Sequence, residues 1–391
     1  MIPRTKVNYG WVALVKSAFV RSRGDRYRSL LARLLRDYFG IRNVMLTPSG
    51  RGGLYAILRV LTQPKVVVPA YTCSAVVEAA QFAGKEVVYV DTPEDEFNVH
   101  ADRLADVLDE HCVLIATHQF GIPCDIEAMA ELCRQRGAFL VEDCAPSFGT
   151  RVSGQLTGTF GDAAFFSFDS TKLINTPMKG GFLAVQDDDL FRRIVEDQAS
   201  YMRPMGLVLK LKNLFLASML LMIEQPSIYR LFHNLMFRWR GRYTQESHEL
   251  ARSPNDFYLT EMAEWQAYLT CDQIQNADAL IERRRAQYHT YREVLASYRR
   301  IIAPPRDERG EWACIRFPIL VRGDKLKYYD QAVERGVDFA FSFTFIQCPD
   351  SCVNAQKLAS RVLDLPYYAK LSDAEQAEVI ETLHELEEAP Q

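Results

Sequence analysis

The stretch Ser167-Phe-Asp-Ser-Thr-Lys172, followed closely by Gly180-Gly181, decides how this sequence is interpreted. It directly follows the apolar run Ala163-Ala-Phe-Phe166, which has the length and composition of a buried strand. The lysine therefore stands just beyond a strand end, with hydroxyl side chains before it. Desolvation at such a place lowers the pKa of an amine and favours its neutral, nucleophilic form.

A second apolar run, Ala138-Phe-Leu-Val141, ends in Glu142-Asp143. Successive side chains of a strand point to opposite faces, so the two carboxylates cannot both face the same site. We expect Asp143 to face the lysine and Glu142 to lie on the other side. A carboxylate buried without a cationic partner is costly, by several kcal/mol, which favours a ligand or an ion pair. Alternatively, Asp143 caps a helix in the segment after Cys144.

A glycine-rich loop, Ser49-Gly-Arg-Gly-Gly53, precedes a helical pattern at 54–61. Backbone amides at a helix N-terminus, with a hydroxyl and a guanidinium beside them, can hold a phosphate dianion. The loop lacks the ending of a nucleotide P-loop, and on its own it could be a tight turn. The hydroxyls of Ser167 and Thr171 could add donors or could cap the local backbone.

A lysine, a carboxylate and a phosphate-binding loop are together the parts that pyridoxal 5'-phosphate (PLP) requires. The lysine forms a Schiff base with the aldehyde, the carboxylate keeps the pyridine nitrogen protonated, and the ring acts as an electron sink. We therefore assign Lys172 as the catalytic residue, which can also carry the α-proton of an amino donor. Lys179 is a rival, but Gly180-Gly181 beside it is typical of a turn.

Short apolar runs alternate with longer helical patterns over residues 44–190. This alternation predicts a mostly parallel sheet covered by helices on both faces. In such sheets ligands bind beyond the carboxyl ends of strands, where Asp143 and the loop at Gly50 are both expected.

The C-terminal part shows a long helical pattern, a strand at 315–321 and further helices, which predict a smaller α+β domain. The predicted fold class is therefore α/β, with a three-layer αβα large domain and a mostly parallel sheet. We expect the large domain at residues 1–250 and the small domain at 251–391.

The segment 203–242 differs from its surroundings, since it holds seven basic side chains and one acid, Glu224. The uncharged apolar part, 213–223, is shorter than the roughly 20 residues that span a bilayer. A basic, apolar, helix-prone stretch suits peripheral contact with a membrane surface or a partner groove. A helix hairpin in the core or in a dimer interface is equally compatible.

Composition sets the remaining bounds. A formal net charge of −4 and a pI near 6.0 give no electrostatic case for a nucleic-acid partner. Nine scattered cysteines and no signal-peptide pattern lead us to expect reduced thiols and a cytoplasmic location, with possible membrane association. We expect no metal site, because the histidines and cysteines lack ligand spacing.

Taken together, these residues resemble the DegT/StrS family of PLP-dependent sugar aminotransferases, a branch of the fold type I enzymes. The likeness runs from about residue 46 to 185 and returns in the C-terminal third. The motifs that carry it are Thr47-Pro-Ser-Gly-Arg-Gly-Gly-Leu54, Val68-Pro-Ala-Tyr-Thr72, His118-Gln-Phe-Gly-Ile-Pro-Cys-Asp125, Val141-Glu-Asp-Cys-Ala145, Ser167-Phe168 with Thr171-Lys172, and Leu363-Asp-Leu-Pro-Tyr-Tyr368.

The resemblance implies a Schiff base at Lys172, a contact of Asp143 with the pyridine nitrogen, and phosphate contacts at Gly50, Arg51 and Ser167. It also implies a homodimer with shared active sites. The usual acceptor in this family is a nucleotide-linked keto-sugar, and the usual amino donor is glutamate or glutamine.

Four positions depart from the family pattern. Cys73 stands where an aromatic ring commonly stacks on the cofactor, so we assign that contact to the thiol. Pro146 replaces a glutamine or histidine. Leu259 and Glu261 align with an asparagine and an arginine that normally reach the partner's site, and Arg51 could offset part of that loss.

The sequence thus predicts a PLP-dependent aminotransferase that moves an amino group from an amino acid to a keto-sugar in glycan or secondary-metabolite biosynthesis. Two alternatives stay open. One is a PLP-dependent sugar dehydratase or other eliminase, and the other is a catalytically weakened PLP-fold scaffold at a membrane.

Overall fold

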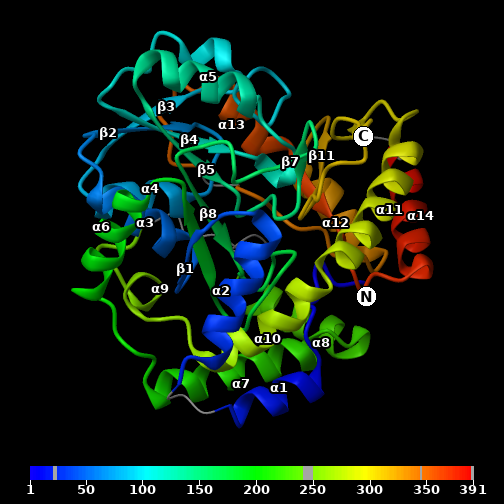
Figure 1. The fold of residues 1–391 in the computed structure, drawn as a ribbon. Coiled ribbons are helices and arrows are strands. Elements are labelled where there is room, and N and C mark those ends of the chain that lie inside the picture. The colour runs from blue at the N-terminus through cyan, green and yellow to red at the C-terminus, as the bar shows by residue number, and fades with distance from the viewer. Residues whose placement is uncertain (21–23, 241–249, 344–345, 389–391) are drawn as a thin grey trace.

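A computed structural model describes residues 1–20, 24–240, 250–343 and 346–388. Its centre is a seven-stranded sheet with the order β1-β9-β8-β5-β4-β2-β3 (Figure 1). The strands are β1 (Asn43–Thr47), β2 (Lys65–Pro69), β3 (Glu86–Val90), β4 (Cys112–Thr117), β5 (Phe139–Asp143), β8 (Ala163–Ser167) and β9 (Gly181–Val185).

The sheet is mostly parallel, as predicted. Strands β3, β2, β4, β5 and β8 run parallel to one another, whereas β9 runs antiparallel to both β8 and β1. Side-chain alternation gives the central strands β4, β5 and β8 two buried faces. Phe165 packs with one helical layer, and the adjacent Phe166 packs with the other.

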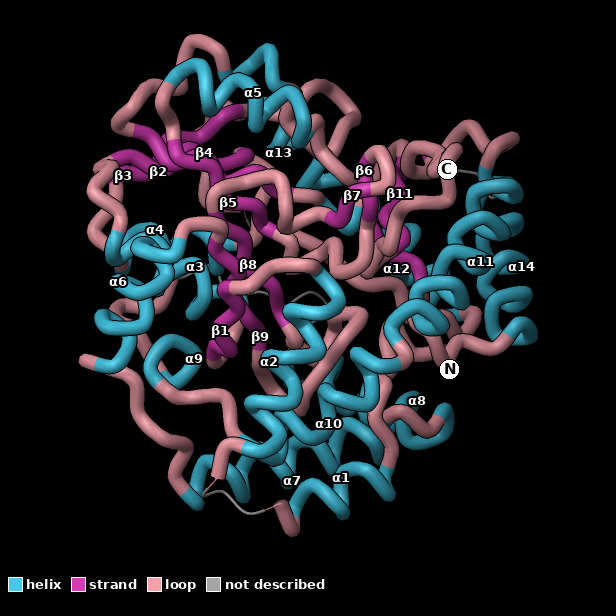
Figure 2. Tube along the Cα trace, viewed as in Figure 1, coloured by secondary structure: helices cyan, strands magenta, loops and turns pink. Residues whose placement is uncertain are grey.

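Helices cover both faces of the sheet (Figure 2), which confirms the predicted three-layer α/β fold. The side chains of one layer share a buried cluster with Phe165, and those of the other layer pack on the opposite face. The first layer comprises α3 (Gly50–Val60), α4 (Ser74–Phe82) and α6 (Asp188–Ala199); the second comprises α2 (Arg26–Phe39), α5 (Ile126–Arg136) and α10 (Glu264–Gln275).

A three-stranded antiparallel sheet, β10-β11-β12, forms a second centre of packing, with its own large apolar cluster. The remaining elements around it and in the connections are β6 (Arg151–Val152), β7 (Gln155–Leu156), α9 (Asp256–Leu259), α11 (Ala277–Leu295), β10 (Ile301–Ile302), β11 (Phe317–Val321), α12 (Lys325–Glu334), α13 (Val353–Arg361), β12 (Val362–Leu365) and α14 (Asp373–Glu388).

The N-terminal residues pack beside the second sheet rather than the first. Ile2 forms a β-bridge with Val337, and the Arg4 guanidinium pairs with the buried Asp338 carboxylate at 2.7 Å. The division into domains at 1–250 and 251–391 remains a proposal.

The described part of the basic apolar segment forms two helices, α7 (Leu207–Ile223) and α8 (Pro226–Arg240). Residues 241 and 242 of that segment lie outside the described residues. Ala217 and Leu221 of α7 pack with Leu14 of α1 (Trp11–Ala18) and Trp265 of α10. The part of the chain that the structure describes contains no helix long and apolar enough to cross a membrane.

Candidate active site

Six residues predicted for the site line one cavity of roughly 210 Å³. The cavity lies where β5 and β8 end and α3 begins, as expected for a ligand site at the carboxyl ends of parallel strands. The predicted residues that it brings together are Gly50, Arg51, Cys73, Asp143, Ser167 and Lys172.

Asp143 is the last residue of β5 and is almost fully buried. One carboxylate oxygen accepts a hydrogen bond from the Ala145 amide at 3.0 Å. Burial raises the pKa of Asp143 to about 6, while the nearby Lys172 ammonium acts in the opposite direction. A cationic ring nitrogen beside this carboxylate would favour its ionised form.

Glu142 points to the other side of β5, as the strand period predicts. Its carboxylate accepts hydrogen bonds from the amides of Gly158, Phe160 and Gly161 at 2.7–2.8 Å. These bonds hold the loop between β7 and β8, so Glu142 has a structural role.

Lys172 is half-buried in the cavity wall, in a turn closed by its own amide and the Asp169 carbonyl at 2.9 Å. Burial, and next the positive charge of Arg316, lower the pKa of the Lys172 amine. Lys179 also lines the cavity but donates to the Asp169 carboxylate, and this ion pair depresses the pKa of Asp169. Lys172 is therefore the better candidate for a neutral amine.

The N-terminus of α3 forms one end of the cavity. The Ser49 hydroxyl caps this helix, because it accepts from the Gly52 amide at 3.0 Å and donates to the Phe257 carbonyl at 2.6 Å. Gly50 and Arg51 are the first two residues of α3, so the helix itself offers no acceptor to their amides. A Cβ at Gly50 would lie 3.0 Å from the Ser167 Cβ, so only glycine leaves this cradle open.

Arg51 supplies a cation next to these amides. Its Nη1 lies 3.0 Å from Glu78 Oε1, and the guanidinium stacks over the Phe257 ring at 5.9 Å. Glu78 also accepts from the Tyr258 hydroxyl at 2.5 Å. The side chain of Arg51 is thereby held in place, with part of its charge offset and further N–H donors left for an anion.

Cys73 lies directly before α4, and burial raises the pKa of its thiol, which keeps the thiol neutral. A thiol can pack on a ring face but does not replace an aromatic stack. Phe120 and Phe343 also line the cavity, with ring centroids 6.0 Å apart.

Three polar cavity residues were not predicted from the sequence, namely Gln119, Asp169 and Arg316. The amide nitrogen of Gln119 is buried and has no acceptor within the described part of the chain. Arg316 enters from the strand region of the second sheet, and its Nη1 lies 2.9 Å from Asp364 Oδ2. Gln119 stands inside a motif that signalled the site, whereas nothing local marks Arg316.

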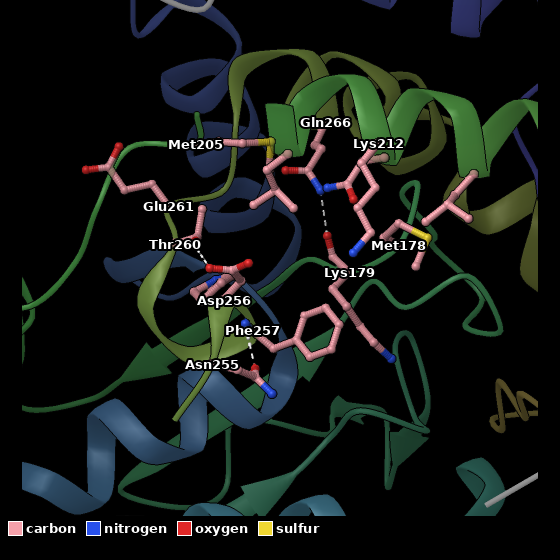
Figure 3. A pocket seen from close by; sticks show the side chains of 14 residues that line it. Met178, Lys179, Met205, Lys212, Asn255, Asp256, Phe257, Thr260, Glu261 and Gln266 are labelled. Carbon is pink, nitrogen blue, oxygen red and sulfur yellow. Dashed lines mark hydrogen bonds between the residues drawn. The ribbon is translucent and has the colours of Figure 1, made fainter. Parts of the chain in front are cut away.

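The departures Pro146, Leu259 and Glu261 have different surroundings. Pro146 lines the cofactor-sized cavity, and the Leu259 carbonyl accepts from the Arg203 amide at 2.9 Å. Glu261 pairs with Arg28 at 2.8 Å. Glu261 also borders a second cavity of about 160 Å³ between α7 and the segment around α9 (Figure 3).

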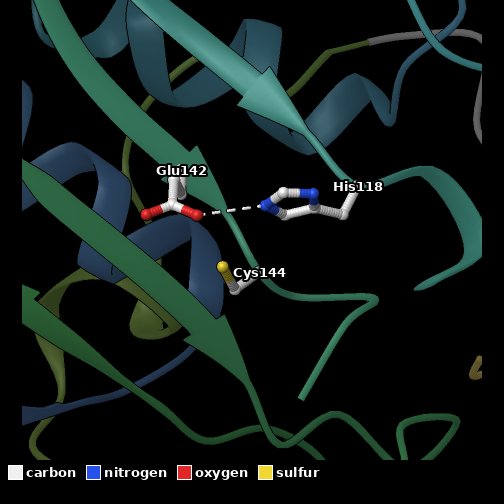
Figure 4. Close-up of side chains that lie close together, drawn as sticks. All are labelled: His118, Glu142 and Cys144. Atoms are coloured by element: carbon white, nitrogen blue, oxygen red, sulfur yellow. Dashed lines mark hydrogen bonds and ion pairs between the residues drawn. The ribbon is translucent and has the colours of Figure 1, made fainter. Parts of the chain in front are cut away.

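His118, Glu142 and Cys144 place three potential metal ligands within 4.8 Å of one another (Figure 4). All three are buried, and His118 Nε2 lies 3.2 Å from Glu142 Oε2. The amide of Cys124 donates to His118 Nδ1 at 3.4 Å. Because Glu142 also accepts three backbone bonds, we interpret the cluster as a link between β4 and β5.

The cavity fits PLP. It offers an amine of lowered pKa, a buried carboxylate, an open helix N-terminus and an unpaired amide donor. A sequence model of the DegT/DnrJ/EryC1/StrS aminotransferase family matches residues 9–384. The chain belongs to this family. Membership confirms the predicted resemblance, the enzyme class of aminotransferase and the PLP cofactor.

Individual members of the family are similar to this chain over different extents. GDP-perosamine synthase of Escherichia coli O157:H7 is 33% identical over 130 residues, which are 33% of this chain and 35% of that protein. The match thus spans about a third of that relative's length.

Solved structures show that the fold is shared throughout. The aminotransferase TlmJ from Streptoalloteichus hindustanus has a TM-score of 0.76 at 22% identity, covering 98% of both chains. The sugar aminotransferase Spr1654 from Streptococcus pneumoniae, described as putative and solved in its PMP form, also reaches 0.76, at 19% identity and 99% of both chains.

Proposed function

We propose that this family member transfers an amino group from glutamate to a nucleotide-linked keto-sugar in glycan or secondary-metabolite biosynthesis. The observation that carries the proposal is the single cavity in which Lys172 and Asp143 face the N-terminus of α3. Similarity to GDP-perosamine synthase supports a sugar acceptor with a nucleotide carrier.

Lys172 is the proposed catalytic residue. PLP, when bound, supplies an aldehyde that takes up the amino group and a ring that stabilises negative charge on the reacting carbon. The lowered pKa of Lys172 lets its amine act first as a nucleophile and then as a base at the donor's α-carbon. The positive charge of Arg316 lowers the pKa of this amine further, so the amine is neutral for more of the time.

Other chain residues would hold the cofactor. Asp143 would accept a hydrogen bond from the protonated ring nitrogen, and Cys73 would pack on the ring. Gly50, Arg51 and Ser167 would bind the phosphate through two amides, a guanidinium and a hydroxyl. Arg316 also offers a cation to a donor carboxylate.

We also propose a homodimer with shared active sites and peripheral membrane contact of the segment 203–242. The dimer proposal rests on membership of the family, although Leu259 and Glu261 replace the asparagine and arginine that normally reach the partner's site. The membrane proposal rests on the basic, apolar character of α7 and α8.

The test is a half-reaction followed by absorbance. The purified holoenzyme should lose its imine band when glutamate is added and regain it when a nucleotide-linked keto-sugar follows. Recovery with an acceptor that loses a hydroxyl instead of gaining an amine would favour the eliminase. A protein that cannot be loaded with PLP would contradict the enzymatic assignment and favour the scaffold.

A further inference from the structure

Helices α1 and α7 each expose an apolar stripe that no described residue covers. Phe19, Val208 and Phe215 are 83%, 82% and 65% exposed. The two stripes have the same spacing of i, i+1, i+4 and i+8. This spacing places each stripe on an arc of about 100° around its helix axis. Their members are Trp11, Val12, Val15 and Phe19 in and just after α1, and Leu207, Val208, Leu211 and Phe215 in α7.

The opposite sides of both helices are buried. Leu14 of α1 and Leu221 of α7 belong to the cluster that includes Trp265 and Leu269 of α10. Helix α7 is therefore apolar on nearly all sides, a pattern normal for a helix that is fully covered. Its outer stripe is an exposed apolar patch, which in a stable protein marks a contact surface.

The two stripes lie on neighbouring helices that share a buried cluster, and together they are called here the α1/α7 face. Helices α1 and α7 contact each other and lie side by side at the edge of the molecule away from β3 (Figures 1 and 2). The Lys210 ammonium donates to the carbonyls of Ala18 and Val20, at 3.2 Å each. These bonds tie α7 to the end of α1 and hold the stripes together.

All charged side chains of α1 and α7 are lysines. Lys16 and Lys212 stand at the same place, one residue after the third member of each stripe, and both are exposed. Neither α1 nor α7 contains an acid. Glu224, which follows α7, turns inward, where it accepts from the Val7 amide and lies 3.7 Å from the Lys370 ammonium.

We propose that the α1/α7 face docks on an anionic membrane surface. The apolar stripes would enter the boundary between headgroups and acyl chains, and the two lysines would extend to lipid phosphates. Charge complementarity favours this occupant. Docking of the face on a second copy would bring lysines against lysines, with no carboxylate in either helix to offset them.

The inference deepens the proposed membrane contact of 203–242, because it adds α1 and specifies the lipid charge. It does not depend on the aminotransferase assignment. Peripheral docking is also compatible with helices that are too short to cross the bilayer.

The experiment compares vesicle binding of the full-length holoenzyme with that of two variants. Sedimentation with vesicles of phosphatidylcholine and phosphatidylglycerol should pull down the native protein, less so at high salt, and pure phosphatidylcholine should pull down less. The double variant Val208→Glu/Phe215→Glu should lower binding by about tenfold or more, since it places two charges in the stripe. Val353→Glu, at a valine of α13 that is 53% exposed, should bind like the native protein.

Three results would overturn the proposal. These are no binding of the native protein to anionic vesicles, equal binding of the double variant, or a fall in oligomer mass caused by the double variant and not by Val353→Glu. The last result would make the face an interface between copies. Cofactor absorbance, recorded on the same samples, reports separately whether the PLP assignment fails.

Discussion

At the scale of single residues, burial shifts Lys172 and Asp143 towards their neutral forms. The pKa of the amine is lowered and that of the carboxyl is raised, because each charge is costly in this buried cavity. A cofactor with a cationic ring nitrogen would favour the ionised carboxylate. Asp143 ends a strand and Lys172 follows one, and these positions were enough to predict the two residues as site candidates. The depth of their burial could not be predicted from local sequence.

Replacement of Asp143 by asparagine should stabilise the apoprotein at alkaline pH. The folded-state pKa of about 6 exceeds the unfolded value near 3.9. The carboxyl group's contribution to stability is thus complete below about pH 3.9 and is lost as the pH rises through 6. The free energy of unfolding of the Asp143→Asn apoprotein should therefore exceed that of the native apoprotein by roughly 2–3 kcal/mol at pH 8. At pH 4 the two values should lie closer together. Urea unfolding measures both.

The same variant should lose catalysis, because an amide cannot keep the ring nitrogen protonated. We expect kcat to fall about 100-fold or more. Native kcat in Asp143→Asn, with normal PLP content, would contradict the assigned role of the carboxylate.

Replacement of Arg316 by glutamine should raise the pKa of Lys172, because it removes the second-largest cause of the lowered value. It should also raise KM for the amino donor by about tenfold, since a charged hydrogen bond is lost. The pH profile of the half-reaction measures the pKa of Lys172, and donor titrations measure KM. Arg322→Gln, the same change at an exposed arginine just after β11, is the control. If both variants behaved alike, Arg316 would have no specific role.

At the scale of elements, the α3 N-terminus and the ends of β5 and β8 make the site. The sequence predicted these strands because short apolar runs end in polar or glycine residues. It did not predict β10, which has two residues and is defined only by its pairing with β11. The long helical pattern predicted for the C-terminal part divides at Asn276 into α10 and α11, because the backbone of Asn276 leaves the helical conformation.

Gly50→Ala should weaken PLP binding while the protein stays folded. The added Cβ would lie 3.0 Å from the Ser167 Cβ and separate α3 from β8 at the phosphate cradle. Overpacking of this kind costs about 1–3 kcal/mol, which corresponds to a loss of about 5- to 150-fold in affinity. Titration of the apoprotein with PLP measures it.

Gly206→Ala provides the matched control, because a Cβ at this N-cap of α7 meets nothing within 4 Å. Equal PLP affinity of Gly50→Ala and Gly206→Ala would contradict a phosphate site at the N-terminus of α3.

At the scale of the whole molecule, the cavity unites segments that are far apart in sequence. Arg316 and Phe343 reach the same space as Gly50 and Lys172. Local patterns predict which residue ends a strand, but they do not say which distant strand faces it. This is why Arg316 was missed, and why the antiparallel direction of β9 was not predicted.

The proposed shared active site makes a prediction about assembly. Light scattering should give twice the chain mass of 44.7 kDa, with or without PLP. A monomer that transaminates at full rate would contradict the shared site, although not the role of Lys172.

The most direct measurement is the position of the cofactor's covalent attachment. Borohydride reduction of the holoenzyme, followed by proteolysis and peptide mass spectrometry, should find one pyridoxyl group on Lys172, and Lys172→Ala should carry none. A pyridoxyl group on Lys179 instead, or native transamination by Lys172→Ala, would contradict the account.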